Sequence, residues 1–232
     1  MDELLERLRH IPTATVCDAY ARLKIRPLER LVMRRLQPVV PLQPRVVGRA
    51  RTQQVISLRD PGKSSLVADR ALHFEIVDGA QPGDVIVVAV AGEDQLASWG
   101  DVLALKAQAQ GVSAVVVDGA VRDASVIAEI GLPLWADGLT PIPQGYGGYS
   151  VASVNQPVTC AGVEVAPGDL IVADADGVVV VPEAELPSVL PICEELEEQE
   201  QRAREGIAAG IALKDLYPSR SYYAAGGEQE DS

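Results

Sequence analysis

Residues 98–131 read SWGDVLALKAQAQGVSAVVVDGAVRDASVIAEIG. Apolar residues such as Val102 and Leu105 recur at helical spacing up to Gly111, which predicts a helix over residues 96–110. An uninterrupted apolar run then predicts a buried strand, and a second helix follows it. The segment is therefore expected to form a helix–strand–helix unit with short connections.

The strand of this unit is expected over residues 113–117, with a turn at Asp118-Gly119 and the second helix over residues 123–130. Asp101 and Asp123 then both lie at helix starts, on either side of one strand. The pattern can be written as an aspartate, twenty intervening residues and an Arg-Asp pair. It could bring two carboxylates and a guanidinium together.

Two interpretations of these helix starts remain open. A helix N-terminus offers unpaired N–H groups and a positive dipole end, so Gly100 and Asp101 could hold a substrate carboxylate, and Arg122 could grip the same anion with two donors. Alternatively, Ser98 and Asp101 form a capping box, Asp123 is an ordinary N-cap, and Arg122 pairs with a nearby carboxylate. The spacing alone does not separate the two.

A wider similarity adds to this pattern. The run GVSAVVVDGAVRD at residues 111–123, followed by LPLWADG at 132–138, resembles the core of the RraA-like family. Similar segments are TVCDA at residues 15–19, QPGDVIVV at 81–88 and GVEVAPGDLIVADADGVVVVP at 162–182. The resemblance spans most of residues 13–217. The family is named for a regulator of ribonuclease activity and includes metal-dependent 4-hydroxy-4-methyl-2-oxoglutarate / 4-carboxy-4-hydroxy-2-oxoadipate aldolases.

The resemblance implies a role for each residue of the pattern, because enzymatic members of the family carry the same aspartate and Arg-Asp pair. By that resemblance Asp123 binds Mg²⁺ or Mn²⁺, Arg122 balances developing negative charge, and Asp101 acts through a water molecule. It also implies that the substrate contacts Gly100, Asp101, Val102, Leu103 and Arg122.

The last predicted helix, residues 183–209, carries an apolar stripe and many glutamates. In the family a glutamate on this helix reaches the site of a neighbouring subunit. Glu198 is placed in that catalytic role from its distance along the chain to Asp123. Glu197 and Glu200 remain alternatives, because no motif fixes the register.

The resemblance implies a class II aldolase that cleaves a 4-hydroxy-2-oxo acid, such as 4-hydroxy-4-methyl-2-oxoglutarate, to pyruvate. Decarboxylation of oxaloacetate passes through the same pyruvate enolate and is expected as a side activity. Two alternatives stay open: a non-catalytic regulator that binds and inhibits ribonuclease E, and a lyase of the same fold acting on another 2-oxo or sugar acid. The sequence does not choose between Mg²⁺ and Mn²⁺ or identify the physiological substrate.

Composition predicts one compact domain. The 232 residues are 47% hydrophobic and 23% charged, which is enough for a sizeable core, and no break in composition divides them. We expect a single domain over residues 1–217 and a disordered tail over residues 218–232. The net charge of −13 argues against a general nucleic-acid binder. Residues 22–51 are locally basic but interrupted by prolines, and we interpret them as a solvated or subunit-facing connection.

Cysteine usage and hydropathy bear on the compartment. Cys17, Cys160 and Cys193 are odd in number and widely spaced, which indicates neither a disulfide framework nor a zinc site. A reducing cytoplasm is the simplest location. The longest apolar stretches have the length of strands and the N-terminal segment is amphipathic, so neither a signal peptide, a spanning helix nor a membrane contact is expected.

Other catalytic schemes find little support. His10 and His73 are the only histidines, which excludes a multi-histidine metal site and leaves few bases for a triad. The fragment Gly62-Lys63-Ser64 lacks the first glycine of a phosphate-binding loop. The four lysines have no apolar setting that would suit Schiff-base chemistry. A metal bound by oxygen ligands remains the best route.

The order of elements predicts an α/β or α+β fold, and the resemblance implies the three-layer, swivelling β/β/α fold of the RraA-like family. It also implies ring-shaped homotrimers, some paired into hexamers, with active sites between subunits. Helices are expected at residues 2–9, 13–23, 65–78, 96–110, 123–130 and 183–209, and strands at residues 46–57, 84–91, 113–117, 133–136, 151–154, 157–160, 170–174 and 177–181.

Overall fold

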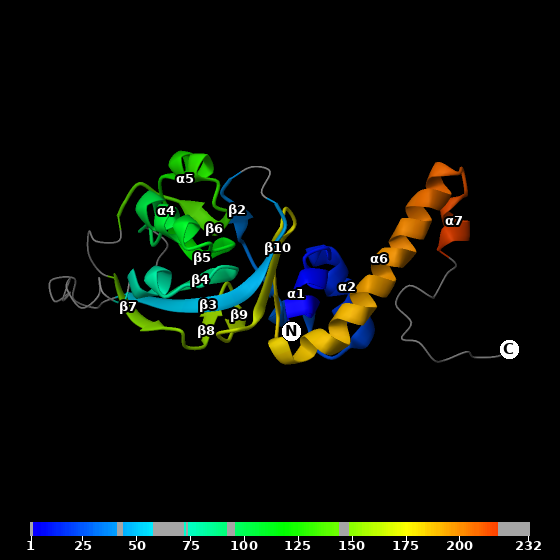
Figure 1. Ribbon diagram of the computed structural model, residues 1–232, viewed down its shortest axis with the longest axis horizontal. Coiled ribbons are helices and arrows are strands. Elements are labelled where there is room, and N and C mark those ends of the chain that lie inside the picture. Colours follow the sequence, from blue (N-terminus) through cyan, green and yellow to red (C-terminus); the bar gives the residue numbers. More distant parts are fainter. Residues whose placement is uncertain are drawn as a thin grey trace.

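The computed structural model describes residues 2–40, 44–57, 72, 74–91, 96–143 and 149–217. Its centre is a mixed sheet in the order β1-β11-β10-β3-β4-β5-β6-β2, with β7 paired to β3 (Figure 1). Neighbouring strands from β3 to β6 run parallel, and the other pairs are antiparallel. The carboxyl ends of β4, β5 and β6 therefore meet at one edge of the sheet.

The bounds of the strands are β1 (Val32–Met33), β2 (Gln37–Pro38), β3 (Val46–Ser57), β4 (Asp84–Ala91), β5 (Ala114–Val121), β6 (Leu134–Leu139), β7 (Tyr149–Val154), β8 (Val158–Cys160), β9 (Val163–Val165), β10 (Leu170–Asp174) and β11 (Gly177–Val181). The helices are α1 (Asp2–Leu8), α2 (Thr13–Leu23), α4 (Asp101–Ala109), α5 (Ala124–Ile130), α6 (Leu186–Ala208) and α7 (Leu213–Leu216), with short 3₁₀ turns at Leu28–Arg30 and Glu183–Glu185.

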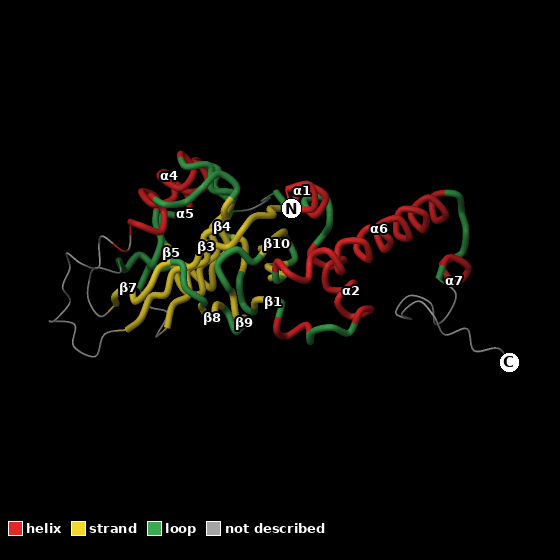
Figure 2. The backbone as a smooth tube through the Cα atoms, turned by 60° about the horizontal axis from the view of Figure 1, so that its bottom comes forward, coloured by secondary structure: helices red, strands yellow, loops and turns green. Residues whose placement is uncertain are grey.

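Helices and a hairpin cover the sheet in layers (Figures 1 and 2). On one face, side chains such as Val88 and Val117 pack beneath α4, α5 and the helical residues 74–78. On the other face, residues such as Val87 and Val116 pack against the β8–β9 hairpin. A third apolar cluster joins β10 and β11 to α1, α2 and α6. The expected mixed fold of sheet and helix layers is confirmed.

The helix–strand–helix unit forms as the apolar pattern predicts. The side chains of Val115–Val117 in β5 point to alternate faces of the sheet and are all fully buried, because both faces are covered. Gly111 ends α4 with φ +77, where its N–H donates to Gln108 O (2.9 Å) and the N–H of Val112 donates to Ala107 O (3.0 Å). These two bonds form a Schellman motif, which explains why a glycine stands there.

Three local expectations were wrong. Asp118-Gly119 is not a turn, because β5 continues through it to Val121 with a shift in its pairing to β6. The helix α4 begins at Asp101 and not near residue 96, since the preceding segment runs alongside the end of β5. The buried face of α4 carries Ala104 and Ala107, whereas the predicted stripe points outward: Val102 is 72% exposed and Leu105 is 57% exposed. The pattern of small residues decides this face, because alanines permit close packing on the sheet.

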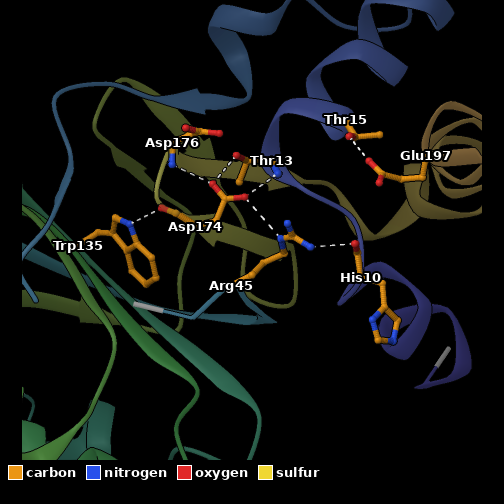
Figure 3. A network of polar contacts seen from close by, with 8 residues as sticks. All are labelled: His10, Thr13, Thr15, Arg45, Trp135, Asp174, Asp176 and Glu197. Carbon is orange, nitrogen blue, oxygen red and sulfur yellow. Dashed lines mark hydrogen bonds and ion pairs between the residues drawn. The ribbon is translucent and has the colours of Figure 1, made fainter. Parts of the chain in front are cut away.

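Asp174 ties the sheet to the N-terminal helices (Figure 3). Its carboxylate accepts hydrogen bonds from Thr13 Oγ1 (2.7 Å), Thr13 N (3.0 Å) and Asp176 N (3.0 Å), and its Oδ2 lies 3.6 Å from Arg45 Nε. The indole of Trp135 donates to the backbone oxygen of Asp174 at 3.0 Å. Burial would raise the pKa of Asp174, but the hydrogen bonds and Arg45 outweigh it and lower the pKa below its usual value.

Most of the arginines in the basic stretch at residues 22–51 bind carboxylates or backbone oxygens of the same chain. Carboxylates pair with Arg22, Arg26, Arg35, Arg45 and Arg49. The guanidinium of Arg51 instead donates to the backbone oxygen of Ile76 at 2.8 Å. These contacts hold α2, β3 and the segments between them against later parts of the chain, so much of this charge is already neutralised by the fold.

The helix α6 projects from the body of the molecule and carries α7 at its far end (Figure 1). Its first half packs against α1 and α2, whereas beyond Leu196 only Ala203 and Gly206 are buried among its described residues. Residues 207–213, at the end of α6 and just beyond it, read IAAGIAL and are exposed at every position. We call this segment the apolar tip. No helix in the described ranges is long and apolar enough to cross a membrane.

Several sequence expectations lie outside the described residues. They concern most of the helix at 65–78, the second histidine at position 73, the Gly62-Lys63-Ser64 fragment and the tail at 218–232. Short elements that the sequence pattern missed are β1, β2, β9 and α7, each of four residues or fewer. Strands this short lack a recognisable period, because two or three residues cannot display alternation.

Candidate functional site

Gly100, Arg122 and Asp123 converge at the carboxyl edge of the parallel strands. The segment before α4 lies alongside the end of β5, where Ser98 N donates to Ala120 O (3.0 Å) and Arg122 N donates to Trp99 O (3.0 Å). The start of α4 therefore faces the Arg-Asp pair that follows β5. The sequence pattern correctly brings these two helix starts together.

Asp123 is held in the left-handed backbone region, with φ 58 and ψ 34. It occupies the N-cap position of α5, but its side chain makes no capping hydrogen bond. Its Oδ2 instead lies 3.1 Å from Nε of Arg122. The capping interpretation is therefore wrong for Asp123, whereas the pairing of Arg122 with a nearby carboxylate is observed. A left-handed backbone at a charged, partly exposed residue occurs often at functional positions.

Gly100 makes room for this ion pair. A β-carbon on residue 100 would lie 3.0 Å from Asp123 Oδ2, 3.1 Å from Arg122 Nε and 3.3 Å from Arg122 Cγ. The backbone of Gly100 is extended, with φ −158, and any residue could adopt it. Glycine is thus required by the close approach of the pair and not by backbone geometry.

The N-terminus of α4 supplies donors beside the pair. Gly100 makes no side-chain cap, so no capping box forms, and Asp101 Oδ1 accepts the N–H of Val102 at 2.8 Å. The first intrahelical bond runs from Ala104 N to Gly100 O. Among the interactions of the described residues, the N–H groups of Asp101 and Leu103 take no part, which leaves them for an anion.

Two buried polar atoms, to which the sequence gave no binding role, lie next to this helix start. Ser98 is 3% exposed and Trp99 is 1% exposed, and neither Ser98 Oγ nor Trp99 Nε1 has a hydrogen-bond partner among the described residues. Buried polar atoms are normally paired, so these two atoms can accept or donate a hydrogen bond beside the start of α4. The only signal in the sequence is the position of these residues directly before Gly100.

Glu198 is not brought to Arg122 within one chain. It lies on α6, at the other end of the molecule from α4 and α5 (Figure 1), and its side chain is 73% exposed with Arg202 Nη1 3.9 Å away. Of the alternatives, Glu200 pairs with Arg204 at 2.6 Å and Glu197 accepts a hydrogen bond from Thr15 (Figure 3). Of the three glutamates, Glu198 thus has the longest contact with a partner in its own chain.

The donor set suits a small divalent cation. Asp123 and Asp101 are both partly exposed carboxylates, and Arg122 leaves the group with a net negative charge. No group of three or more His, Cys, Asp or Glu side chains placed to share an ion occurs within the described ranges. Mg²⁺ and Mn²⁺ fit such a site, because they need only one or two carboxylates and fill their shells with water and substrate oxygens.

The cysteines do not suit a nucleophilic role. Burial raises the pKa of Cys17 to about 11 and that of Cys193 to about 12, and it also raises the pKa of Cys160. Each thiol therefore stays protonated near neutral pH, whereas a cysteine nucleophile acts as the thiolate.

Comparison with known proteins places the chain in a family. The RraA-like family, described as Aldolase/RraA, matches residues 13–180. A protein of Halalkalibacterium halodurans with the provisional name 4-hydroxy-4-methyl-2-oxoglutarate aldolase is 30% identical over 220 residues, covering 93% of each chain. Streptomyces coelicolor RraAS2, described as an unusual member of the RNase ES inhibitor RraA family, superposes with a TM-score of 0.76 at 32% identity, covering 88% of this chain and 96% of that one.

A crystal structure of an uncharacterized protein from Pseudomonas syringae pv. tomato is also similar, with a TM-score of 0.78 and 27% identity over 93% of this chain and 97% of that one. The matched family region contains Gly100, Asp101, Arg122 and Asp123. The chain therefore belongs to the RraA-like family.

Proposed function

We propose that this protein is a divalent-metal-dependent aldolase that cleaves a 4-hydroxy-2-oxo acid, such as 4-hydroxy-4-methyl-2-oxoglutarate, to pyruvate and a second oxo acid. The observation that carries the proposal is the convergence of Asp123, Arg122 and the open N-terminus of α4 around Gly100. One carboxylate for a cation and two kinds of anion donor suit a 2-oxo acid, which presents a carboxylate beside a keto oxygen. Relatives that carry aldolase names support the same reaction class.

Each residue has a definite task in this reaction. Asp123 holds the Mg²⁺ or Mn²⁺ ion, which supplies Lewis-acid polarisation of the keto oxygen when bound. Arg122 and the N–H groups at the start of α4 bind the carboxylate and balance the negative charge that develops on the pyruvate half. Asp101 positions a water molecule that takes the proton from the 4-hydroxyl. The bond between carbons 3 and 4 then breaks, carbon 4 becomes the carbonyl of the second oxo acid, and the electrons of the bond form the pyruvate enolate. The water held by Asp101 returns the proton to the enolate carbon, which gives pyruvate.

Oxaloacetate decarboxylation follows from the same groups. Loss of carbon dioxide from oxaloacetate leaves the same enolate, so Arg122 and the α4 N-terminus stabilise it without change. The side activity should depend on Asp123 as strongly as the aldol cleavage does. A decarboxylase activity that survives loss of Asp123 would point to a different site.

The proposed active unit is a homo-oligomer, a trimer or a hexamer, in which Glu198 of a neighbouring subunit completes each site. Two features of the single chain support it. The apolar tip projects at the far end of α6, and its residues are exposed in the single chain. Exposed apolar side chains near the site are Val102, Leu105, Val126, Leu139 and Ile142. Two different apolar surfaces at opposite ends favour a head-to-tail contact, which closes into a ring.

The decisive test is an assay of the purified full chain for pyruvate release from 4-hydroxy-4-methyl-2-oxoglutarate and from oxaloacetate. Turnover should require Mg²⁺ or Mn²⁺ and stop with a chelator. Arg122→Ala should lower kcat by at least about 10²-fold, the usual effect of losing one electrostatic stabiliser. Absence of metal-dependent turnover on both substrates would contradict the aldolase proposal.

A second candidate is a regulator that binds and inhibits a ribonuclease of the E type. The observation that favours it is the similarity to RraAS2, which covers 88% of this chain. Inhibition of ribonuclease E cleavage by this protein, unchanged in Asp123→Asn, would support a regulatory role independent of the metal site. If Asp123→Asn lost catalysis and the unaltered protein did not inhibit ribonuclease E, only the aldolase proposal would remain.

A further inference from the structure

The ion pair between Arg122 and Asp123 lies at the centre of the candidate site. Nε of Arg122 lies 3.1 Å from Oδ2 of Asp123, and the two side chains are 42% and 34% exposed. Both press against the space that a β-carbon of Gly100 would fill. The guanidinium of Arg122 therefore contacts the same Asp123 oxygen that would bind the cation under the proposed function.

The two partners differ in their freedom to move. Asp123 is fixed by its left-handed backbone at the start of α5, where its backbone oxygen accepts the N–H of Ile127 at 3.0 Å. The backbone of Arg122 is also anchored, through the bond from its N–H to Trp99 O, but its long side chain is the more exposed of the two. A change in the pair is therefore expected to move the guanidinium and not the carboxylate.

We propose that Arg122 is an exchangeable counter-ion, an inference that rests on the proposed function. Without a cation the guanidinium neutralises Asp123. A divalent cation on Asp123 would place like charges a few ångströms apart, and their repulsion turns Arg122 away from the carboxylate. Its planar donors are then free for the substrate carboxylate. Cation and anion binding become coupled, because an anion on Arg122 relieves the repulsion that opposes the cation.

The test measures Mn²⁺ binding to the full chain by electron paramagnetic resonance of the free ion, at low salt and without substrate. Arg122→Gln should tighten Mn²⁺ binding by about threefold or more, because it removes the competing charge. Arg122→Lys keeps the charge and should stay close to the unaltered protein. Lys106→Gln is the matched control, since it removes one positive charge from α4 beside Asp78 and should leave the affinity unchanged.

Raising the salt concentration gives a second readout. Screening weakens the repulsion between partly exposed charges, so the difference between Arg122→Gln and the unaltered protein should shrink at high salt. Equal or weaker Mn²⁺ binding by Arg122→Gln at low salt would overturn the counter-ion proposal while leaving Asp123 as the ligand. Mn²⁺ binding that persists in Asp123→Asn would overturn both the counter-ion and the metal-ligand assignments.

Discussion

Gly100 and Asp123 approach so closely that a β-carbon on residue 100 would lie 3.0 Å from the carboxylate oxygen Oδ2. We expect Gly100→Ala to fold, because the backbone is extended and the crowded atoms belong to movable side chains. The methyl group should displace the Arg122–Asp123 pair and lower kcat by about 10²-fold, the effect of a misplacement near 1 Å. Steady-state kinetics and thermal unfolding together check this. Normal kcat in a folded variant would show that the close contact has no catalytic consequence.

Two substitutions at Asp123 distinguish metal binding by its side chain from the stability of its left-handed backbone. Asp123→Asn should abolish Mn²⁺ binding and turnover while leaving stability close to normal, because asparagine tolerates the left-handed region and keeps the shape of the side chain. Asp123→Ala should lose the same activity and, in addition, about 1 kcal/mol of unfolding free energy, because alanine is strained at φ 58. Urea unfolding and metal titration measure the two effects. Equal stability of the two variants would contradict the strain argument.

The sequence pattern predicted one spatial relationship of the candidate site, the proximity of two helix starts. The spacing between Asp101 and Arg122-Asp123 correctly placed two helix starts together, because a buried strand of fixed length separates them. It could not show that Asp123 lacks a capping bond, since side-chain capping needs an extended backbone and Asp123 has a left-handed one. It also gave no indication that Gly100 is required by contact, because that contact comes from a residue distant in sequence.

Long apolar runs predicted the strands correctly. Positions whose conformation is determined by tertiary contacts were predicted wrongly. The fully buried Val115–Val117 read correctly as a strand, but Asp118-Gly119 read as a turn because those residues are common in turns. In the chain, Asp118 Oδ2 accepts the N–H of Ala161 at 2.6 Å, and this contact with the β8–β9 hairpin lies 43 residues away in sequence. Local propensity cannot anticipate such a partner.

Asp174 should make the unfolding free energy depend on pH. Its pKa is lowered in the folded chain, so its carboxylate stabilises the fold above the pKa of the unfolded chain, and that contribution is lost as pH falls through the folded value. Asp174→Asn should lower the unfolding free energy at pH 7 by about 1–3 kcal/mol, because Thr13 loses a charged acceptor. The difference should narrow below about pH 4. Denaturant titrations at both pH values test this, and a gap independent of pH would refute the assignment to charge.

The apolar tip should control assembly. Replacing Ile207, Ile211 and Leu213 together by serine should shift the oligomer toward smaller species, because each of these side chains is exposed in the single chain and would be buried in a subunit contact. Light scattering coupled to size-exclusion chromatography measures the mass. Replacing Ala208 and Ala212 by serine is the matched control, which alters the same segment with little change in apolar area. Identical masses for all three proteins would exclude the tip as an interface.

Glu198 and Asp123 should belong to different subunits of one site. Glu198 lies on α6 at the other end of the molecule from Asp123, so a site that needs both residues is built across a contact. We expect Glu198→Gln and Asp123→Asn each to be inactive alone and to regain activity when co-expressed in one oligomer. Random mixing in a ring leaves about one quarter of the contacts with both native residues, so activity should approach that fraction. Catalysis by Glu198→Gln alone at the normal rate would remove Glu198 from the reaction, and mixtures without activity would contradict a site shared between two subunits.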